Sequence, residues 1–208
     1  MAKNHRLLWH VSFLFACLLS NSAFAAPEDH FVTTWKTDNP GASNNSSIIV
    51  PMIGGPYDVD WDNDGTFDEF GLTGSVTHYY GVAGTYTIRI RGTYDTIRIA
   101  WGGDRNKMLS LNQWGTNAWK SMNSAFRGAT NLVLPANDLP NFSAVTDMSN
   151  MFSGATWANP DTSGWDTSKV TNMSNMFVGA TSANPDTINL ASKYPMQRTE
   201  LLDVKSSS

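Results

Sequence analysis

The sequence is poor in the side chains that enzymes most often use for covalent or proton-transfer chemistry. Its 208 residues include one cysteine and four histidines, and only His30 and His78 lie beyond residue 25. Hydrolytic triads need a histidine beside a nucleophile and a carboxylate. No stretch matches the G-x-S-x-G, H-E-x-x-H or P-loop patterns. We therefore predict that the protein is not an enzyme and has no catalytic residues.

Basic residues are scarce as well. The chain has 14 Lys and Arg against 18 Asp and Glu, which gives a formal net charge of −4. Binding to a phosphate backbone needs a basic patch. The acidic balance therefore argues against nucleic acid as a partner, and it also argues against attraction to anionic membranes.

Residues 1–25 have the pattern of a signal peptide. Lys3 and Arg6 precede a largely apolar run, and Ala23-Phe24-Ala25 has the small-x-small form of a cleavage site. The apolar run is shorter than the ~20 residues that a membrane-spanning helix needs, and no second run follows. We therefore predict an exported protein, at the cell surface or secreted, whose mature chain has no transmembrane segment.

Cleavage after Ala25 would remove Cys17, the only cysteine, and would change the net charge from −4 to −6. The mature chain would then have no disulfide and no thiolate ligand. An alternative is lipid anchoring through Cys17, because Leu14-Phe15-Ala16-Cys17 loosely resembles a lipoprotein processing site.

Residues 27–115 show the pattern of a β domain. From Thr85 to Arg91, apolar Tyr86, Ile88 and Ile90 alternate with Thr and Arg. This alternation predicts a strand with one buried face and one solvent-exposed face. Short runs of this kind separated by turn residues are typical of a β-sandwich. The predicted strands cover residues 31–36, 48–50, 57–61, 76–80, 85–91 and 96–101, with 92–95 as a hairpin turn between the last two.

Residues 116–187 contain a repeat. VTDMSNMFSGATWANPDT, from Val145, and VTNMSNMFVGATSANPDT, from Val170, are offset by 25 residues and share 15 of 18 positions. A weaker copy lies 26 residues upstream, around Phe126. This period falls in the range of leucine-rich repeats, whose units bury their apolar faces only by stacking. We therefore predict a short solenoid of α/β coils, with Met148, Met151 and Phe152 in register with Met173, Met176 and Phe177.

Within each coil, the Val-Thr-x-Met segment is the predicted strand, and Ser-Asn-Met-Phe-x-Gly-Ala is a predicted turn of helix closed by Gly154 or Gly179. Small polar residues beside the predicted core would face outward and form a candidate ligand-binding surface: Thr146, Asp147, Thr171 and Asn172. Trp157 is a further candidate, because Ser182 replaces it in the next repeat and the core therefore does not require an aromatic there.

The densest acidic cluster lies in a turn that follows the predicted strand 57–61. It contains Asp60, Asp62, Asp64, Gly65, Asp68 and Glu69. The D-x-D-x-D-G order matches the start of a calcium-binding loop, but Gly71 stands where an EF-hand has its twelfth-position glutamate. Three interpretations stay open: a purely structural turn, a structural calcium site on Asp60, Asp62, Asp64 and Asp68, and a catalytic carboxylate pair. No other cofactor is predicted.

The repeats resemble the BspA-like leucine-rich-repeat surface proteins of bacteria. Trp165-Asp166, Val170-Thr171, Met173 and Met176-Phe177 fall in the order of that family's W-D-T/V-S-x-V-T-x-M-x-x-M-F unit. The pattern does not continue beyond residue 187, since Pro195 stands where Val170 would recur, and residues 188–208 are a divergent cap or tail. The resemblance implies a non-catalytic cell-surface or secreted protein, in which adhesin-like members bind host matrix proteins or other cells.

The first half resembles a PKD-type, immunoglobulin-like sandwich. The resemblance rests on Val59 to Gly65, on Thr77-His78-Tyr79-Tyr80 and on the segment from Ala83 to Ile88, while Asp62-Asn63-Asp64-Gly65 departs from the usual W-x-G-D-G turn. It implies the fold alone.

Three functions are compatible with these features. The leading one is a non-catalytic surface or secreted interaction protein that binds an extracellular protein or glycan. The second is a structural module of the envelope, stabilised by calcium. The third is an exported carbohydrate-binding or carbohydrate-active protein, in which Trp157 would stack on sugars and two facing carboxylates would act.

Overall fold

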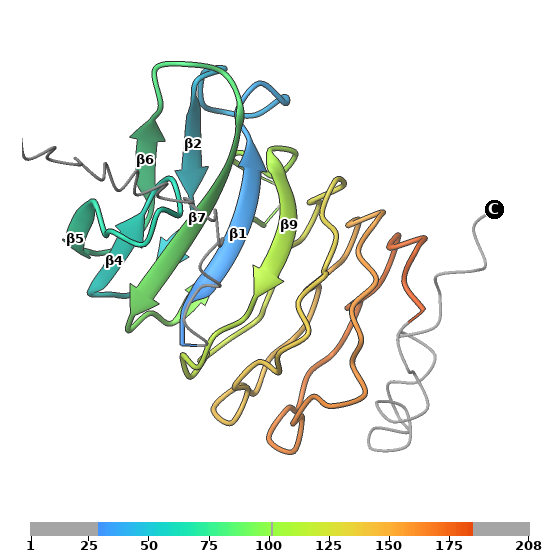
Figure 1. Ribbon diagram of the computed structural model, residues 1–208. Coiled ribbons are helices and arrows are strands. Elements are labelled where there is room, and N and C mark those ends of the chain that lie inside the picture. Colours follow the sequence, from blue (N-terminus) through green and yellow to red (C-terminus); the bar gives the residue numbers. More distant parts are fainter. Residues whose placement is uncertain (1–28, 101, 185–208) are drawn as a thin grey trace, which may run out of the picture.

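The computed structural model describes residues 29–100 and 102–184 (Figure 1). In these residues the fold is mainly β and contains no helix, so none of their segments is a helix long and apolar enough to cross a membrane. The predicted signal peptide of residues 1–25 with Cys17, and the predicted cap or tail of residues 188–208, lie outside the described residues.

The first part of the chain forms three antiparallel sheets. The largest has the strand order β5-β4-β7-β1-β9, and the other two are the pairs β2-β6 and β3-β8. The strands are β1 (Phe31–Lys36), β2 (Ser47–Val50), β3 (Met52–Ile53), β4 (Tyr57–Asp60), β5 (Glu69–Leu72), β6 (Val76–Tyr79), β7 (Thr85–Gly92), β8 (Thr96–Ile97) and β9 (Met108–Gln113).

Five predicted strands, at 31–36, 48–50, 57–61, 76–80 and 85–91, agree with β1, β2, β4, β6 and β7 to within one residue. The predicted hairpin at 92–95 is wrong, because β8 pairs with β3 and not with β7. Gly92 lies against β4, where a side chain would come within 2.7 Å of the Pro56 carbonyl oxygen, and Asp95 N then donates to Ile53 O. The chain therefore leaves the large sheet at Gly92.

Strand β9 belongs to two assemblies at once. On one side it pairs antiparallel with β1, and on the other it meets residue 133 in a parallel bridge. Leu111 N donates to Val133 O and Val133 N donates to Leu109 O. Beyond this strand, successive turns of the chain lie side by side (Figure 1). We call them the first, second and third layers, and they contain Phe126, Phe152 and Phe177, respectively. The hydrophobic core runs from Phe31 to Ala180 as one cluster, without a break at the predicted 115/116 boundary.

The layers are joined by a ladder of main-chain hydrogen bonds between corresponding repeat positions. In the second layer, the N–H groups of Met148, Asn150, Phe152 and Gly154 donate to carbonyls 24 residues further along the chain. Of the intervening N–H groups, those of Met151 and Ser153 donate to a carbonyl three residues earlier in the same layer, and that of Ser149 donates to Asp147 Oδ1. Every second donor therefore joins two layers, while the others close tight turns.

This alternation explains why the predicted turn of helix is absent from the described layers. A helix would direct each N–H group to a carbonyl four residues earlier, whereas here half of the donors cross to the next layer. Ser124, Asn150 and Asn175 occupy equivalent positions and have φ values of 56°, 57° and 56°. A left-handed residue in the middle of the segment interrupts a right-handed helix, and asparagine tolerates that conformation better than most residues.

The repeat side chains superpose as predicted. Phe126, Phe152 and Phe177 stack with centroid separations of 5.4 and 5.5 Å and nearly parallel rings. The aligned methionines Met148 and Met173 are fully buried. Trp165 packs inward against Trp114 and Phe142.

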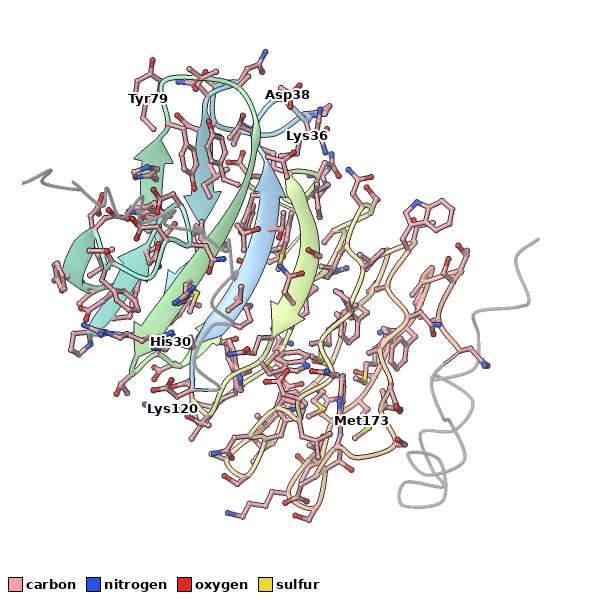
Figure 2. All side chains as sticks on the ribbon, in the orientation of Figure 1. His30, Lys36, Asp38, Tyr79, Lys120 and Met173 are labelled. Carbon is pink, nitrogen blue, oxygen red and sulfur yellow. The ribbon has the colours of Figure 1, made fainter. Side chains whose placement is uncertain are left out.

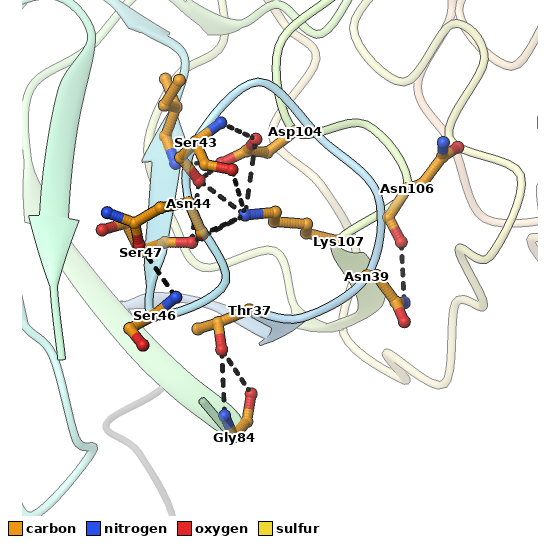
Figure 3. A network of polar contacts seen from close by, with 11 residues as sticks. Thr37, Asn39, Ser43, Asn44, Ser46, Ser47, Gly84, Asp104, Asn106 and Lys107 are labelled. Carbon is orange, nitrogen blue, oxygen red and sulfur yellow. Dashed lines mark hydrogen bonds and ion pairs between the residues drawn. The ribbon is translucent and has the colours of Figure 1, made fainter. Parts of the chain in front are cut away.

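A buried lysine fastens the loop before β2 to the chain just before β9 (Figure 3). The Lys107 ammonium is fully buried and donates to the carbonyls of Ser43, Asn44 and Ser47 and to the Ser43 hydroxyl, at 2.7–3.1 Å. Asp104 lies 3.9 Å away and accepts from Ser43 N and Ile49 N. This network ties the smaller sheet β2-β6 to the start of the layered region.

Candidate functional site

The acidic turn connects β4 to β5 at one edge of the large sheet. Val59 lies opposite Glu69, and Asp68 N donates to Val59 O at 2.9 Å, so the pairing of these strands closes the turn at its base. Asn63 and Gly65 have φ values of 60° and 100°, which reverse the chain within a few residues. Gly65 has open space where a side chain would lie, so backbone conformation, rather than crowding, favours glycine there.

The turn is organised by its own carboxylates. Asp60 is fully buried and accepts from Asp64 N at 3.2 Å and from Gly65 N at 3.0 Å. Asp62 Oδ1 also accepts from Asp64 N, and Asp68 Oδ2 accepts from Trp61 N at 2.8 Å. These bonds hold the carboxylates around a common centre.

Three of the four predicted metal ligands come together. Oxygen atoms of Asp60, Asp62 and Asp68 all lie within 4.8 Å of one another. That spacing suits a hard cation, since calcium binds oxygen ligands at 2.3–2.6 Å and two oxygens on one ion are at most about 5 Å apart. Asp64 does not belong to this group, and its Oδ1 instead accepts from Thr66 N at 2.7 Å.

Arg89 on β7 lies behind the turn. Its side chain is almost fully buried, with Nε 3.7 Å from Asp60 Oδ2, and it donates twice to Asn63 Oδ1. The alternation of residues 85–91 predicts that Arg89 lies on the solvent-exposed face of its strand, and that prediction is wrong. Arg89 lies opposite Asp60 across the β4–β7 pair, and the buried carboxylate compensates its charge. One of the three converging carboxylates is thus already neutralised by the protein.

The exposed carboxylates of the turn still crowd one another. Burial raises the pKa of Asp62, and the neighbouring carboxylates of Asp64, Asp68 and Asp60 act in the same direction, against the N–H group of Asp64. Like charges in one place favour either a bound proton or a bound cation. The carboxylates of the turn therefore suit a divalent cation, with Asp62 and Asp68 as the charges that no basic side chain of the described residues pairs with.

Aromatic rings cover one side of the turn. The Trp61 ring stacks on His78 with a centroid separation of 4.3 Å, and His78 Nδ1 lies 3.6 Å from Glu69 Oε1. Burial lowers the pKa of His78 despite the opposing effect of the Glu69 carboxylate. Burial therefore favours the neutral form of His78.

The second candidate site is the outward side of the layers. Thr146 and Thr171 are exposed, and Thr171 N donates to Thr146 O at 2.8 Å, so these two residues are neighbours. Asp147 and Asn172 form a parallel bridge. Their side-chain oxygens accept from Ser149 N and Ser174 N, respectively, which gives both residues a role in shaping the next turn. Four of the five predicted surface residues are thus side by side.

Trp157 lies apart from them. It follows Thr156, whose carbonyl accepts from Ser182 N at the opposite end of the inter-layer ladder. Its side chain is 61% exposed, which agrees with the prediction that the core does not require it. The layers and the acidic turn are also separate regions, since Figure 2 shows Met173 within the layers, on the opposite side of the molecule from β4 and β5, which the acidic turn connects (Figure 1).

Sequence reasoning missed several side chains that organise these regions. Arg91 donates to Asp58 and lies 3.9 Å over the Phe67 ring, beside the acidic turn. Lys107 and Asp104 gave no signal of burial, because nothing in the spacing of charged residues shows which carbonyls the fold will turn inward. The opposed pairs Asp60–Arg89 and Asp58–Arg91 become visible only when the register of β4 with β7 is known.

The layered region is the part of the chain that matches a known family. No curated protein and no solved structure matches the chain. A family model described as "Mycoplasma protein of unknown function, DUF285" matches residues 99–202, half of the chain. This family is associated with BspA-like surface repeat proteins. The chain therefore belongs to the DUF285 family.

Proposed function

We propose that the protein is an exported, non-catalytic interaction protein that binds an extracellular protein or glycan through its layered region. In this proposal residues 116–187 are a short leucine-rich-repeat-type solenoid, and residues 27–115 are a PKD-type sandwich that supports it. The family match, the 25-residue period and the inter-layer ladder all favour the repeat part of this assignment, and the antiparallel strands of residues 31–97 are compatible with the sandwich part.

The observation that carries the proposal is the alignment of equivalent outward residues in successive layers. Thr146 lies beside Thr171, Asp147 beside Asn172, and the carbonyl of Thr156 accepts a hydrogen bond from Ser182 N. The valine, methionine and phenylalanine residues at the repeated core positions of these layers are buried, so the polar rows and the exposed Trp157 are what a partner meets. Repeat proteins commonly bind through such extended rows of equivalent positions.

A binding screen on the purified mature chain tests the proposal. The chain would be immobilised and exposed to extracellular matrix proteins and to an array of glycans. We expect saturable binding that is reduced at least tenfold when Thr146 and Thr171 are both replaced by arginine, because two long charged side chains would obstruct the row. Thr77→Arg, on the exposed side of β6, is the matched control and should leave binding unchanged.

The proposal would be contradicted by a folded chain that binds none of the matrix proteins and none of the glycans. Equal loss of binding in Thr77→Arg would instead show that added positive charge, rather than the row, is responsible. Trp157→Ala is tested on the glycans alone, since an exposed aromatic ring is a common platform for a sugar. Selective loss of glycan binding in that variant would favour the carbohydrate-binding alternative, and hydrolysis of a glycan would favour the carbohydrate-active one.

A second candidate function is that of an envelope module stabilised by calcium. It is favoured by the convergence of Asp60, Asp62 and Asp68 within 4.8 Å. A cation that binds only the folded state raises the free energy of unfolding by mass action. We expect millimolar calcium to raise the melting temperature of the mature chain, and Asp62→Asn and Asp68→Asn each to remove most of that rise.

Asp161→Asn is the matched control for the calcium experiment. Asp161 is exposed in the layered region and accepts from Ser163 N, a bond that the asparagine oxygen can keep. This variant should respond to calcium as the parent does. The calcium hypothesis would be refuted if calcium left the melting temperature of the parent unchanged and Asp62→Asn were as stable as the parent. The acidic cluster would then be interpreted as a purely structural turn.

A further inference from the structure

A pocket of about 390 Å³ lies where β9 ends beside the first layer. Residues 133–136 run beside β9, since the N–H groups of Val133 and Ala136 donate to carbonyls of that strand. The turn after β9 contributes one side of the pocket, and the loop after residue 136 contributes the other. The lining consists of Gln113, Gly115, Thr116, Asn137, Asp138 and Leu139. The volume falls within the range of small-ligand pockets, ~300–1,000 Å³.

The Asp138 carboxylate joins the two sides of the pocket. Its Oδ1 accepts from Trp114 N at 3.0 Å, and its Oδ2 accepts from Trp114 N and Gly115 N, both at 2.9 Å. A carboxylate has about four lone-pair sites, so these bonds leave one acceptor site, on Oδ1. Within residues 29–100 and 102–184, Asp138 forms no ion pair. The main chain therefore fixes this carboxylate in place and leaves it able to accept one further hydrogen bond.

Thr116 and Asn137 add a hydroxyl and an amide that form no hydrogen bond with another described side chain or main-chain group. Both residues are exposed, so a ligand in the pocket can reach these groups. The Gln113 amide, in the same lining, donates to His30 O at 2.7 Å, which holds that side chain against β1. Hydroxyls and amides each donate and accept, and they therefore match ligand groups that do both.

Leu139 supplies an apolar surface at the same place. Its side chain is 61% exposed. A Cβ atom at Gly164 would come within 2.6 Å of Leu139 Cδ2, so the leucine lies directly against this glycine and is supported by it. The pocket thus combines one fixed carboxylate, one hydroxyl and one amide with a supported apolar surface.

We propose that this pocket binds one neutral sugar unit of an extracellular glycan. Asp138, Thr116 and Asn137 bind its hydroxyls, and Leu139 packs against the C–H groups of its ring. A sugar presents both kinds of surface, and a charge-assisted bond from a hydroxyl to a carboxylate is stronger than a bond between neutral groups. An anion is disfavoured because the Asp138 carboxylate would repel it.

An ammonium group is the alternative occupant that the carboxylate suggests. The Asp138 charge is already shared among main-chain N–H groups, and the lining has neither a second carboxylate nor an aromatic ring to hold a cation. The lining includes no residue of the Thr146–Thr171 row. The inference therefore goes beyond the proposed binding role of that row and does not depend on it.

Nuclear magnetic resonance titration of the ¹⁵N-labelled full-length chain tests the proposal. The probes are the methyl glycosides of glucose, galactose, mannose and N-acetylglucosamine. We expect at least one of them to shift the amide signals of Gly115, Thr116 and Asn137 saturably. Thr116→Val combined with Asn137→Ala should weaken this binding about tenfold, because two hydrogen bonds to the sugar are lost. Asn45→Ala combined with Thr77→Val removes the same groups from exposed positions elsewhere and should leave the binding unchanged.

Three outcomes would overturn the proposal. The pocket amides could stay unshifted by all four glycosides up to their solubility limits, or they could shift with methylammonium chloride and with no glycoside. Equal weakening in both double variants would show that the pocket groups are not what binds. Thr146→Arg combined with Thr171→Arg should leave the titration unchanged, so a failure of the proposed function is distinguishable from a failure of this inference.

Discussion

At the scale of single residues, buried charges are the features with the largest expected energies. Lys107 and Asp104 are both fully buried, and each satisfies several main-chain groups of the 43–49 segment. Burial lowers the pKa of Lys107, against the effect of the Asp104 carboxylate. Breaking such a pair leaves an uncompensated charge and unsatisfied carbonyls, which costs more than the intact pair contributes.

We therefore predict that Lys107→Met lowers the free energy of unfolding by about 3 kcal/mol, because four hydrogen bonds are lost and Asp104 stays buried without its cation. Urea denaturation measures the change. Lys120→Met, which removes an exposed ion pair with Asp95, is the control and should cost at most about 0.5 kcal/mol. Similar losses in both variants would show that the Lys107 network contributes little.

Tyr57 makes the free energy of unfolding depend on pH in the alkaline range. Its hydroxyl donates to Gly74 O, and burial, with a smaller effect of Glu69, raises its pKa to about 12. The unfolded phenol ionises near its ordinary value of about 10. Between these two values the folded state holds a proton that the unfolded state has lost, so stability falls as the pH rises.

We predict that Tyr57→Phe reduces this loss of stability between pH 10 and pH 12 by up to about 1.4 kcal/mol per pH unit. Urea denaturation at a series of pH values measures the slope. The parent chain, measured over the same series of pH values, gives the reference slope. An unchanged slope in Tyr57→Phe would mean that this phenol does not ionise differently in the folded and unfolded states.

At the scale of elements, hydrophobic periodicity predicted the strands better than their partners. The alternation in β7 and the run of β1 are visible in the sequence, because one face of each strand meets the core. The pairing of β8 with β3 depends on where the chain turns after Gly92, which close contact with Pro56 and Tyr57 decides. The sequence predicted the candidate metal-ligating carboxylates for the same local reason: Asp60, Asp62 and Asp68 are close in sequence.

The left-handed positions of the layers provide a prediction at this scale. Asn150 has a φ of 57°, and its N–H group donates to Ser174 O in the next layer. We expect Asn150→Val to lower the free energy of unfolding by about 2 kcal/mol, because a β-branched residue is strained in this conformation. Asn150→Gly should be within about 0.5 kcal/mol of the parent. Thermal and urea unfolding measure both, and equal costs would refute a left-handed requirement.

At the scale of the whole molecule, β9 joins the sheets to the layers. It pairs with β1 on one side and bonds to residue 133 on the other, and the core continues through it. A shared strand and a common core couple the stability of the two parts. The molecule should therefore not behave as two domains separated near residue 115.

We predict that Thr33 in β1 and Phe126 in the first layer exchange their amide hydrogens with opening free energies that agree within about 1 kcal/mol. Native-state exchange at increasing urea concentrations measures both. Opening of Phe126 at a free energy several kcal/mol below that of Thr33 would indicate that the layers unfold separately. Coincident transitions by fluorescence and circular dichroism would support a single cooperative unit.

The sequence by itself determined the repeat, its period and the residues that stack, since each coil must bury the same apolar positions on its neighbour. It also determined the acidic turn, whose carboxylates are only a few residues apart. Only the tertiary structure decided that Asp60 is compensated by Arg89, that Lys107 is buried under the 43–47 loop, and that β9 belongs to both parts of the fold. These depend on contacts between residues far apart in the chain, for which a local pattern carries no signal.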